Sequence, residues 1–221
     1  MPVIVGQAKH VEIPVDSCLL PGELTVPVDA CGIVLFAHGS GSSRLSPRNR
    51  AVARLLVERG LGTVLMDLLT EAEAGDRGNV FDVTLLAGRL GQAVRWLRGL
   101  ADVAALPIGI FGASTGAAAA LVAAAELRGD VRAVVSRGGR PDLAGEDLDA
   151  VRCPVLLLVG GRDDVVLELN REAAERLQCP HALEVVPGAT HLFEEPGALD
   201  TVAEAAARFF LSSFEEEVPR P

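Results

Sequence analysis

Short, mostly apolar runs alternate along the chain with longer stretches in which apolar residues recur at helical spacing. A short apolar run without polar alternation is typical of a strand that is buried on both faces of a sheet. Four runs have this character, residues 32–37, 107–111, 131–135 and 154–159, and residues 63–66 and 183–186 are predicted to be two further strands. Five stretches are predicted to be helices: residues 47–59, 80–100, 117–127, 167–177 and 198–214. This alternation predicts a parallel sheet with helices on both faces.

The beginning of the chain has a different pattern. Residues 11–15 and 19–26 alternate loosely between apolar and polar side chains, and Pro21-Gly22 interrupts the second run. Such runs predict an antiparallel pair of strands. The expected fold class is therefore α/β, with a mostly parallel sheet of about eight strands. We expect a single domain over residues 1–214 and a polar tail over residues 215–221.

The pentapeptide Gly112-Ala113-Ser114-Thr115-Gly116 lies between a predicted strand and a predicted helix. A serine on a sharp turn from strand to helix is typical of a nucleophile elbow, where the backbone is strained and the neighbours must be small. The two glycines meet that requirement. The N-terminus of the following helix favours negative charge beside the serine. Ser114 is therefore the candidate nucleophile.

A serine nucleophile needs a base to take its proton and an acid to orient that base. Asp163 follows the predicted strand at 154–159 and is the expected acid. Asp164 is the alternative acid, and either aspartate could instead cap the following helix. His191 follows the predicted strand at 183–186 and is the expected base. The order serine, aspartate, histidine is that of the α/β-hydrolase fold.

The loop after the strand at 32–37 is the expected source of one oxyanion donor. Acyl transfer needs two backbone N–H groups that stabilise the tetrahedral intermediate. The amide of Thr115 and the amide of Ser40 are the expected pair, and His38 is expected to hold the loop in place. Gly39 to Gly41 also resembles the start of a dinucleotide-binding turn, but Arg44 stands where the third glycine would be. No cofactor is therefore expected.

Composition limits the possible partners. The formal net charge is −10 and the pI is about 4.9, which argues against a nucleic acid or an anionic membrane surface as partner. The four cysteines show no Cys-x-x-Cys pairing and are expected to be buried free thiols. No pair of histidines has the spacing of metal ligands, so no metal is expected. The first residues lack the pattern of a signal peptide, and the expected location is the cytoplasm.

Four segments together resemble the α/β-hydrolase superfamily, in its dienelactone-hydrolase-like group. These are residues 38–44 (His-Gly-Ser-Gly-Ser-Ser-Arg), the elbow at Ser114, residues 160–164 (Gly-Gly-Arg-Asp-Asp) and residues 188–191 (Gly-Ala-Thr-His). Dienelactone hydrolases proper carry cysteine in the elbow, and this chain carries serine. The resemblance is therefore to the small serine hydrolases of the group, some of which resemble a domain fused to phosphoribosyltransferases.

The resemblance implies a serine hydrolase that acts on a small acyl substrate. Residues 136–151 are too few for the lid domain that this fold inserts at that place, so an open site is expected. Small, water-soluble esters, thioesters or lactones fit such a site. Arg137 and Arg140 follow a strand at the same sheet edge and could bind a carboxylate or phosphate of the substrate. Arg44 could contribute from the oxyanion loop.

Two other functions remain open from the sequence. One is a scaffold or partner domain that keeps the fold without catalysis. The other is an acyltransferase, in which an alcohol or amine replaces water as the acceptor of the acyl group. An intact Ser114, Asp163 and His191 favours catalysis over the scaffold.

Overall fold

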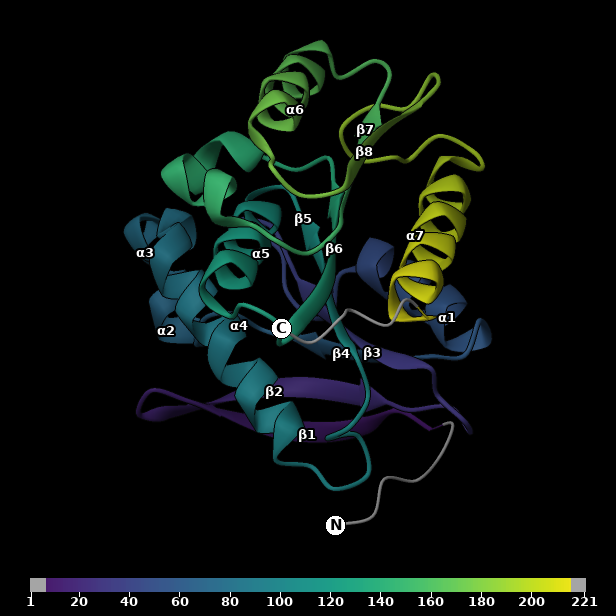
Figure 1. The fold of residues 1–221 in the computed structure, drawn as a ribbon. Helices are drawn as coiled ribbons and strands as arrows, with labels where there is room; N and C mark the ends of the chain where they lie inside the picture. The colour runs from purple at the N-terminus through teal and green to yellow at the C-terminus, as the bar shows by residue number, and fades with distance from the viewer. Residues whose placement is uncertain (1–6, 216–221) are drawn as a thin grey trace.

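A computed structural model describes residues 7–215 of the chain, so most of the predicted tail at 215–221 lies outside the described residues. Eight strands form one sheet in the order β1-β2-β4-β3-β5-β6-β7-β8 (Figure 1). The strands are β1 (Lys9–Val15), β2 (Cys18–Thr25), β3 (Gly32–Ala37), β4 (Leu61–Met66), β5 (Ile108–Ala113), β6 (Val131–Arg137), β7 (Val155–Gly160) and β8 (His181–Val186). The prediction of an α/β fold with eight strands is confirmed.

Parallel pairing begins at β4 and continues to β8, as the apolar runs predicted. β1 pairs with β2, and β2 with β4, in antiparallel register, whereas each later pair is parallel. The residues of β3, β4, β5 and β7 are buried throughout, because helices cover both faces of these strands. The antiparallel opening pair lies at one edge of the sheet, where each strand alternates between buried and exposed residues.

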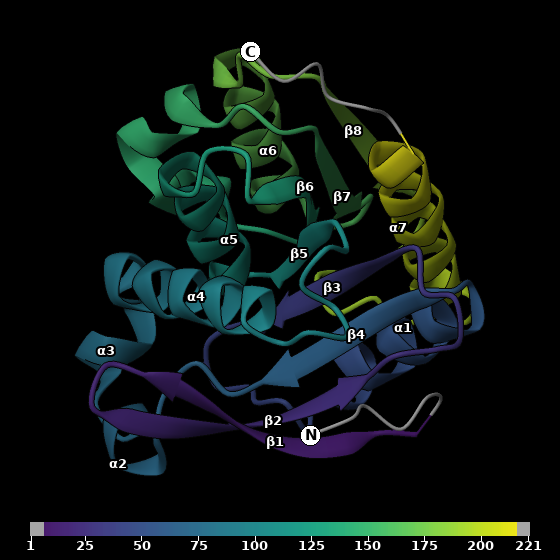
Figure 2. The ribbon, with the colours of Figure 1, turned by 60° about the horizontal axis from the view of Figure 1, so that its bottom comes forward.

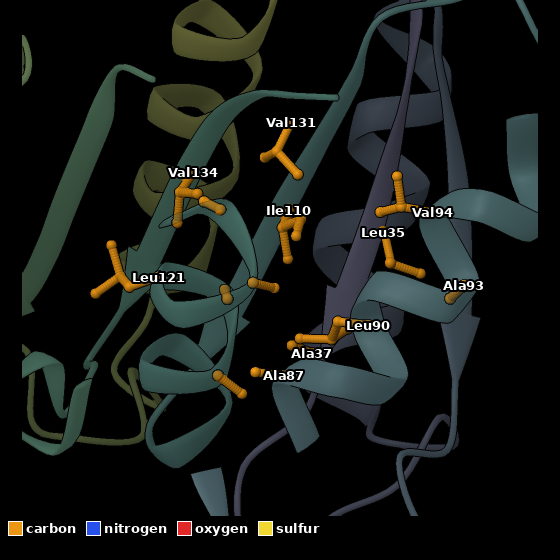
Figure 3. Packing of buried hydrophobic residues seen from close by; sticks show 14 of the residues in the cluster. Leu35, Ala37, Ala87, Leu90, Ala93, Val94, Ile110, Leu121, Val131 and Val134 are labelled. Carbon is orange, nitrogen blue, oxygen red and sulfur yellow. The ribbon is translucent and has the colours of Figure 1, made fainter. Parts of the chain in front are cut away.

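The helices divide between the two faces of the sheet (Figure 2). One face carries α1 (Pro47–Glu58) and α7 (Ala198–Glu215), whose buried residues pack with Phe36, Phe111 and Val135. The opposite face carries α4 (Val83–Arg98) and α5 (Thr115–Glu126), and α6 (Asp164–Arg176) lies on the same side nearer β7 and β8. Figure 3 shows Leu35, Ile110 and Val134 of the sheet beside Leu90 of α4 and Leu121 of α5.

Helix α5 is rich in alanine, and its small side chains let it approach the sheet closely. Every residue from Thr115 to Ala125 is buried. A Cβ added to Gly112 would lie 2.4 Å from the Cα of Ala117, and one added to Gly116 would lie 2.3 Å from the carbonyl oxygen of Ala37. The start of α5 therefore lies directly against the ends of β3 and β5, which is what brings Ser114 close to the loop after β3.

Three helical segments were not predicted, and one predicted helix begins later than expected. The predicted helix at 80–100 begins at Val83 instead, because the side chain of Asp82 accepts a hydrogen bond from the amide of Leu85 and caps the helix there. Two short helices precede it, α2 (Glu71–Ala74) and α3 (Arg77–Phe81). A 3-10 helix, η1 (Pro141–Ala150), fills the segment between β6 and β7 and packs against α5 and α6. It is no lid domain, in agreement with the prediction from length.

The cysteines depart in part from the expectation of buried thiols. All four are free, but Cys31 is exposed, and Cys18 and Cys153 are only partly buried. Cys31 lies in the turn before β3, where the side chain faces outward even though the strand behind it is buried. The expectation of a buried thiol holds for Cys179.

Candidate active site

The backbone at Ser114 has the strained geometry that an elbow requires. Ser114 has φ 51° and ψ −122°, a region that residues with a side chain rarely adopt. Its amide donates to the carbonyl of Arg137 at 3.2 Å, and its own carbonyl accepts from the amide of Arg140 at 3.2 Å. Although Ser114 occupies the N-cap position of α5, its side chain makes no capping hydrogen bond. The hydroxyl is thus not used to hold the helix.

The loops after β7 and β8 bring Asp163 and His191 together. Nδ1 of His191 lies 2.7 Å from Oδ2 of Asp163, within hydrogen-bonding distance. Asp163 occupies the N-cap position of α6, yet its side chain makes no cap hydrogen bond there. Its carboxylate is turned to the imidazole instead. Asp164, the alternative acid, is the first residue of α6 and is exposed. Of the two aspartates, Asp163 is the one in contact with His191.

The turn after β6 lies under the histidine loop and beside the elbow. Residues Ala113 and Arg137 are partners in the register of β5 and β6, so Gly138 follows β6 beside Ser114. A Cβ added to Gly138 would lie 3.2 Å from the carbonyl oxygen of His191 and 3.5 Å from its Cε1. Gly138 also has a positive φ of 50°. A glycine is needed here because it lets the imidazole reach over the end of β6 toward the elbow.

The loop after β3 is held by His38 and by the elbow. Nε2 of His38 accepts the amide N–H of Leu68 at 3.1 Å, and Nδ1 lies 3.0 Å from the carbonyl of Gly39, to which it donates. Burial lowers the pKa of His38, which favours the neutral ring that this pattern needs. His38 thus holds the loop in place, as expected from the sequence.

The predicted oxyanion residues lie side by side, but one amide already has an acceptor. The N–H of Ser40 donates to the side-chain Oγ1 of Thr115 at 2.9 Å. Thr115 is the first residue of α5 and is only 4% exposed. Both residues belong to the wall of a cavity of about 760 Å³. Its other walls come from the loop after β3, from the β2 turn around Leu19 and from the segment around α2.

The three candidate arginines differ in what they bind. Arg140 makes a bidentate ion pair with Asp142 at 2.8 and 2.6 Å, which raises the pKa of its guanidinium. Arg44 pairs with Asp67 through both its amide and its guanidinium. Arg137 makes no ion pair with a carboxylate among the described residues. Arg140 and Arg44 therefore each already bind a carboxylate of this acidic chain.

Arg137 is buried beside the histidine loop. It is 8% exposed, and burial, with repulsion from Arg48, lowers its pKa to about 10. Its guanidinium lies 5.9 Å from the ring centroid of Phe193, and Nη2 reaches Oδ1 of Asn49 at 3.5 Å. Nε and Nη1 are buried without a hydrogen-bond partner in the protein. Phe193, which has a positive φ of 55°, was not predicted to matter, because neither its type nor its spacing signals this contact.

Two other kinds of site, a metal centre and a membrane-spanning helix, are absent from residues 7–215. Over residues 7–215, no group of three or more His, Cys, Asp or Glu side chains is placed to hold a metal ion. In that same range, no helix combines the length and the apolar character that crossing a membrane requires.

A known family and several solved structures are similar to this chain. A family model described as the dienelactone hydrolase family matches residues 31–215. The structure of a dienelactone hydrolase from Anabaena variabilis is 52% identical, with a TM-score of 0.90, over 93% of this chain and 97% of that one. Est1E from Butyrivibrio proteoclasticus is 20% identical with a TM-score of 0.80, over 94% and 99% of the two chains, which shows a shared fold.

A longer relative is also similar. A Mycobacterium tuberculosis protein, provisionally named a phosphoribosyl transferase, is 57% identical over 203 residues in strains H37Rv and CDC 1551. The match covers 92% of this chain and 46% of that protein, so the chain spans about half the length of the relative.

Proposed function

Because this chain belongs to the dienelactone hydrolase family, we propose that it is a serine hydrolase that cleaves small acyl esters, thioesters or lactones. The contact between His191 and Asp163, at the sheet edge where Ser114 forms the elbow, carries the proposal. An imidazole that is oriented by a partly buried carboxylate beside a strained serine is the arrangement that activates a hydroxyl for nucleophilic attack.

In this mechanism Ser114 attacks the carbonyl carbon of the substrate, and His191 takes the hydroxyl proton. The oxygen–carbon bond forms as the carbonyl π electrons move to oxygen. The carbonyl then re-forms, the bond from carbon to the leaving group breaks and His191 gives its proton to that group, so that an acyl-enzyme remains. Water, with its proton taken by the same histidine, then attacks the acyl carbon, the bond from that carbon to Ser114 breaks and the proton returns to the serine oxygen, which releases the acid. Asp163 holds the tautomer of His191 whose Nε2 is free to accept that proton, and it stabilises the imidazolium.

The Thr115 amide is the proposed first donor to the oxyanion. It is the first N–H of α5 and follows Ser114 directly, so it has no partner within the helix and carries the positive end of the helix dipole. Ser40 is the proposed second residue of the oxyanion hole, and its proximity to Thr115 supports this role. The positive φ of Ser114 turns the start of α5 toward the place where charge develops.

Among the three arginines, Arg137 is the best candidate for binding an anionic group of the substrate. Arg140 and Arg44 would each have to give up a carboxylate partner, whereas Arg137 retains nitrogen atoms without one. A matched pair of substrates tests this, one ester with a terminal carboxylate and one with a methyl ester in its place. In Arg137→Met the rate on the carboxylate substrate should fall to that on the neutral one. An unchanged ratio would assign the residue to packing on Phe193.

The phosphoribosyl transferase name belongs to a relative about twice as long, and it carries no proposal for this chain. The elbow, the acid and the base are all within the part that the two proteins share. The activity proposed for this chain is therefore the one that its own residues support.

Reaction with a fluorophosphonate probe, with the adduct mapped by mass spectrometry, tests the proposal. Ser114 should be labelled in the wild-type protein and in Asp164→Asn, whose exposed carboxylate touches no part of the site. Labelling should fall at least about 10³-fold in His191→Ala and in Asp163→Asn. A folded wild-type protein without an adduct would favour the scaffold function. Product analysis with added alcohol or amine distinguishes hydrolysis from acyl transfer.

A further inference from the structure

We propose that the hydroxyl of Thr115 donates a hydrogen bond to the oxyanion and that the amide of Ser40 acts through this hydroxyl. The inference rests on the proposed function and assigns a new role within it. Its starting point is the hydrogen bond from Ser40 N–H to Thr115 Oγ1 at 2.9 Å. An amide whose single hydrogen already donates to a protein oxygen at 2.9 Å is not free to donate to the substrate.

The hydroxyl of Thr115 still has a proton to give. A threonine hydroxyl is one donor with two acceptor lone pairs, and the contact with Ser40 uses a lone pair only. No acceptor for the Thr115 O–H is found among the described residues. The side chain is 4% exposed and forms part of the wall of the 760 Å³ cavity beside the elbow. A buried hydroxyl without an acceptor costs stability, unless an oxygen of the substrate supplies one.

The position of Thr115 suits a second donor to the same oxygen. Its amide is already the proposed first donor, and N and Oγ1 of one threonine are linked through only Cα and Cβ. Both can therefore be directed at one oxygen atom beside Ser114. Accepting the Ser40 N–H polarises the hydroxyl and makes its proton a stronger donor. The proton stays on Thr115 throughout, while the proton of Ser114 moves to His191 and the carbonyl electrons move to oxygen.

The turn that carries Ser40 allows the amide to be removed cleanly. The amide of Ser42 donates to the carbonyl of Gly39 at 3.2 Å, and Gly41 has a φ of +68°. These are the marks of a type II turn with Ser40 as its second residue, where proline is favoured. Ser40→Pro therefore deletes the N–H within a turn that proline fits, but its Cδ takes the place of the hydrogen directed at Thr115 Oγ1, so the variant is read where residue 115 carries no γ atom. Thr115→Val deletes the hydroxyl and keeps the shape of the side chain.

A double-mutant cycle that combines Ser40→Pro with loss of the Thr115 hydroxyl tests the proposal. Hydrolysis of 4-nitrophenyl acetate gives kcat and KM, and a trifluoromethyl ketone, which forms a tetrahedral oxyanion on the nucleophile, gives Ki. In Thr115→Val we expect kcat to fall and Ki to rise by about 10²-fold, the effect of losing one oxyanion donor, while KM changes less than about threefold. Thr115→Ser should recover most of the lost rate. Ser40→Pro should lower kcat in the wild-type background and have no further effect in Thr115→Ala, which lacks the γ atoms that the proline Cδ would meet.

Two controls separate this result from a loss of folding. Thr63→Val removes the hydroxyl of a similarly buried threonine, 2% exposed, in β4, which β3 separates from the strand that leads to the elbow. It should leave kcat unchanged. Thermal unfolding of each variant identifies any that fails to fold, and Thr115→Ala then also replaces Thr115→Val as the single variant.

Each of the other outcomes overturns the proposal in a different way. A kcat in Thr115→Val that equals or exceeds that of the wild type would mean that the hydroxyl does not stabilise the oxyanion or that it blocks the Ser40 amide. Multiplied losses in the double variant would mean that the Ser40 amide contacts the oxyanion itself. Both results leave the proposed function intact. A wild-type protein whose Ser114 is not labelled by the fluorophosphonate would overturn the proposed function and this inference together.

Discussion

Replacing Gly116 with alanine tests how closely the elbow depends on the contact between α5 and β3. The added Cβ would lie 2.3 Å from the carbonyl oxygen of Ala37 and 2.4 Å from that of His38. Both atoms are backbone, so no side chain can rotate away. Ordinary contacts of a Cβ begin at 3.4 Å, and relief therefore requires the start of α5 and the end of β3 to separate by about 1 Å.

Two effects of opposite sign determine the change in stability. Overpacking in a close-packed interior costs about 1–3 kcal/mol, whereas alanine is favoured over glycine within a helix by up to about 1 kcal/mol. The net loss in the free energy of unfolding should be about 1–2 kcal/mol. The loss of activity should be larger, because the shift carries Ser114 and the Thr115 amide away from the Ser40 loop. A misplacement of about 1 Å can lower a rate by about 10²-fold.

Urea denaturation and the rate of fluorophosphonate labelling measure the two effects separately. Gly88→Ala is the matched control, since Gly88 lies within α4 and no atom lies within 4 Å of its added Cβ. That variant should be up to about 1 kcal/mol more stable than the wild type and should be labelled at the wild-type rate. If Gly116→Ala were as stable as Gly88→Ala, or were labelled normally, the close contact would not position the elbow.

Three further results are expected. Ser114→Gly should abolish labelling, because the nucleophile is removed. It should also raise the free energy of unfolding in urea by about 1 kcal/mol, because glycine adopts the φ of 51° without strain. A loss of stability would show that the backbone at Ser114 is not strained. Arg89 lowers the pKa of Glu73 to about 2, so this pair stabilises the fold above the unfolded pKa near 4.5 and the contribution is lost as the pH falls toward 2. In Arg89→Met this acid dependence should be absent from urea titrations. Cys31 should react first with a disulfide reagent, since burial raises the pKa of Cys153 to about 12, and first modification of Cys153 would contradict this.

The sequence predicted the sheet well because its signal is strong. Strands buried on both faces are continuous apolar runs, and the predicted run at 32–37 coincides with β3. The short helices α2 and α3 escaped prediction because they bury no residue, so no apolar periodicity marks them. The break before α4 depends on one capping side chain, that of Asp82, which an amphipathic pattern does not reveal.

The candidate site was predictable in its residue types and less so in its contacts. Adjacent aspartates follow β7, and only the turn into α6 determines that Asp163 faces His191 while Asp164 faces solvent. Arg137 and Arg140 were equivalent candidates in the sequence. Asp142 lies two residues after Arg140 and forms an ion pair with its guanidinium. The buried position of Arg137 follows instead from the packing of the loop after β8.

The elbow, the oxyanion loop and the histidine loop all depend on close approach between backbone segments. Gly116 lets α5 rest on the end of β3, and a Cβ added to Gly39 would lie 3.0 Å from the Cβ of Ser114. Gly138 likewise leaves room for the loop that carries His191. The strain at Ser114 persists only because these contacts and the hydrogen bond to Arg137 fix the backbone on both sides. The reactive groups are thus positioned by main chain, and a substitution that adds a single methyl group there should affect activity more than one that removes a side chain from the rim.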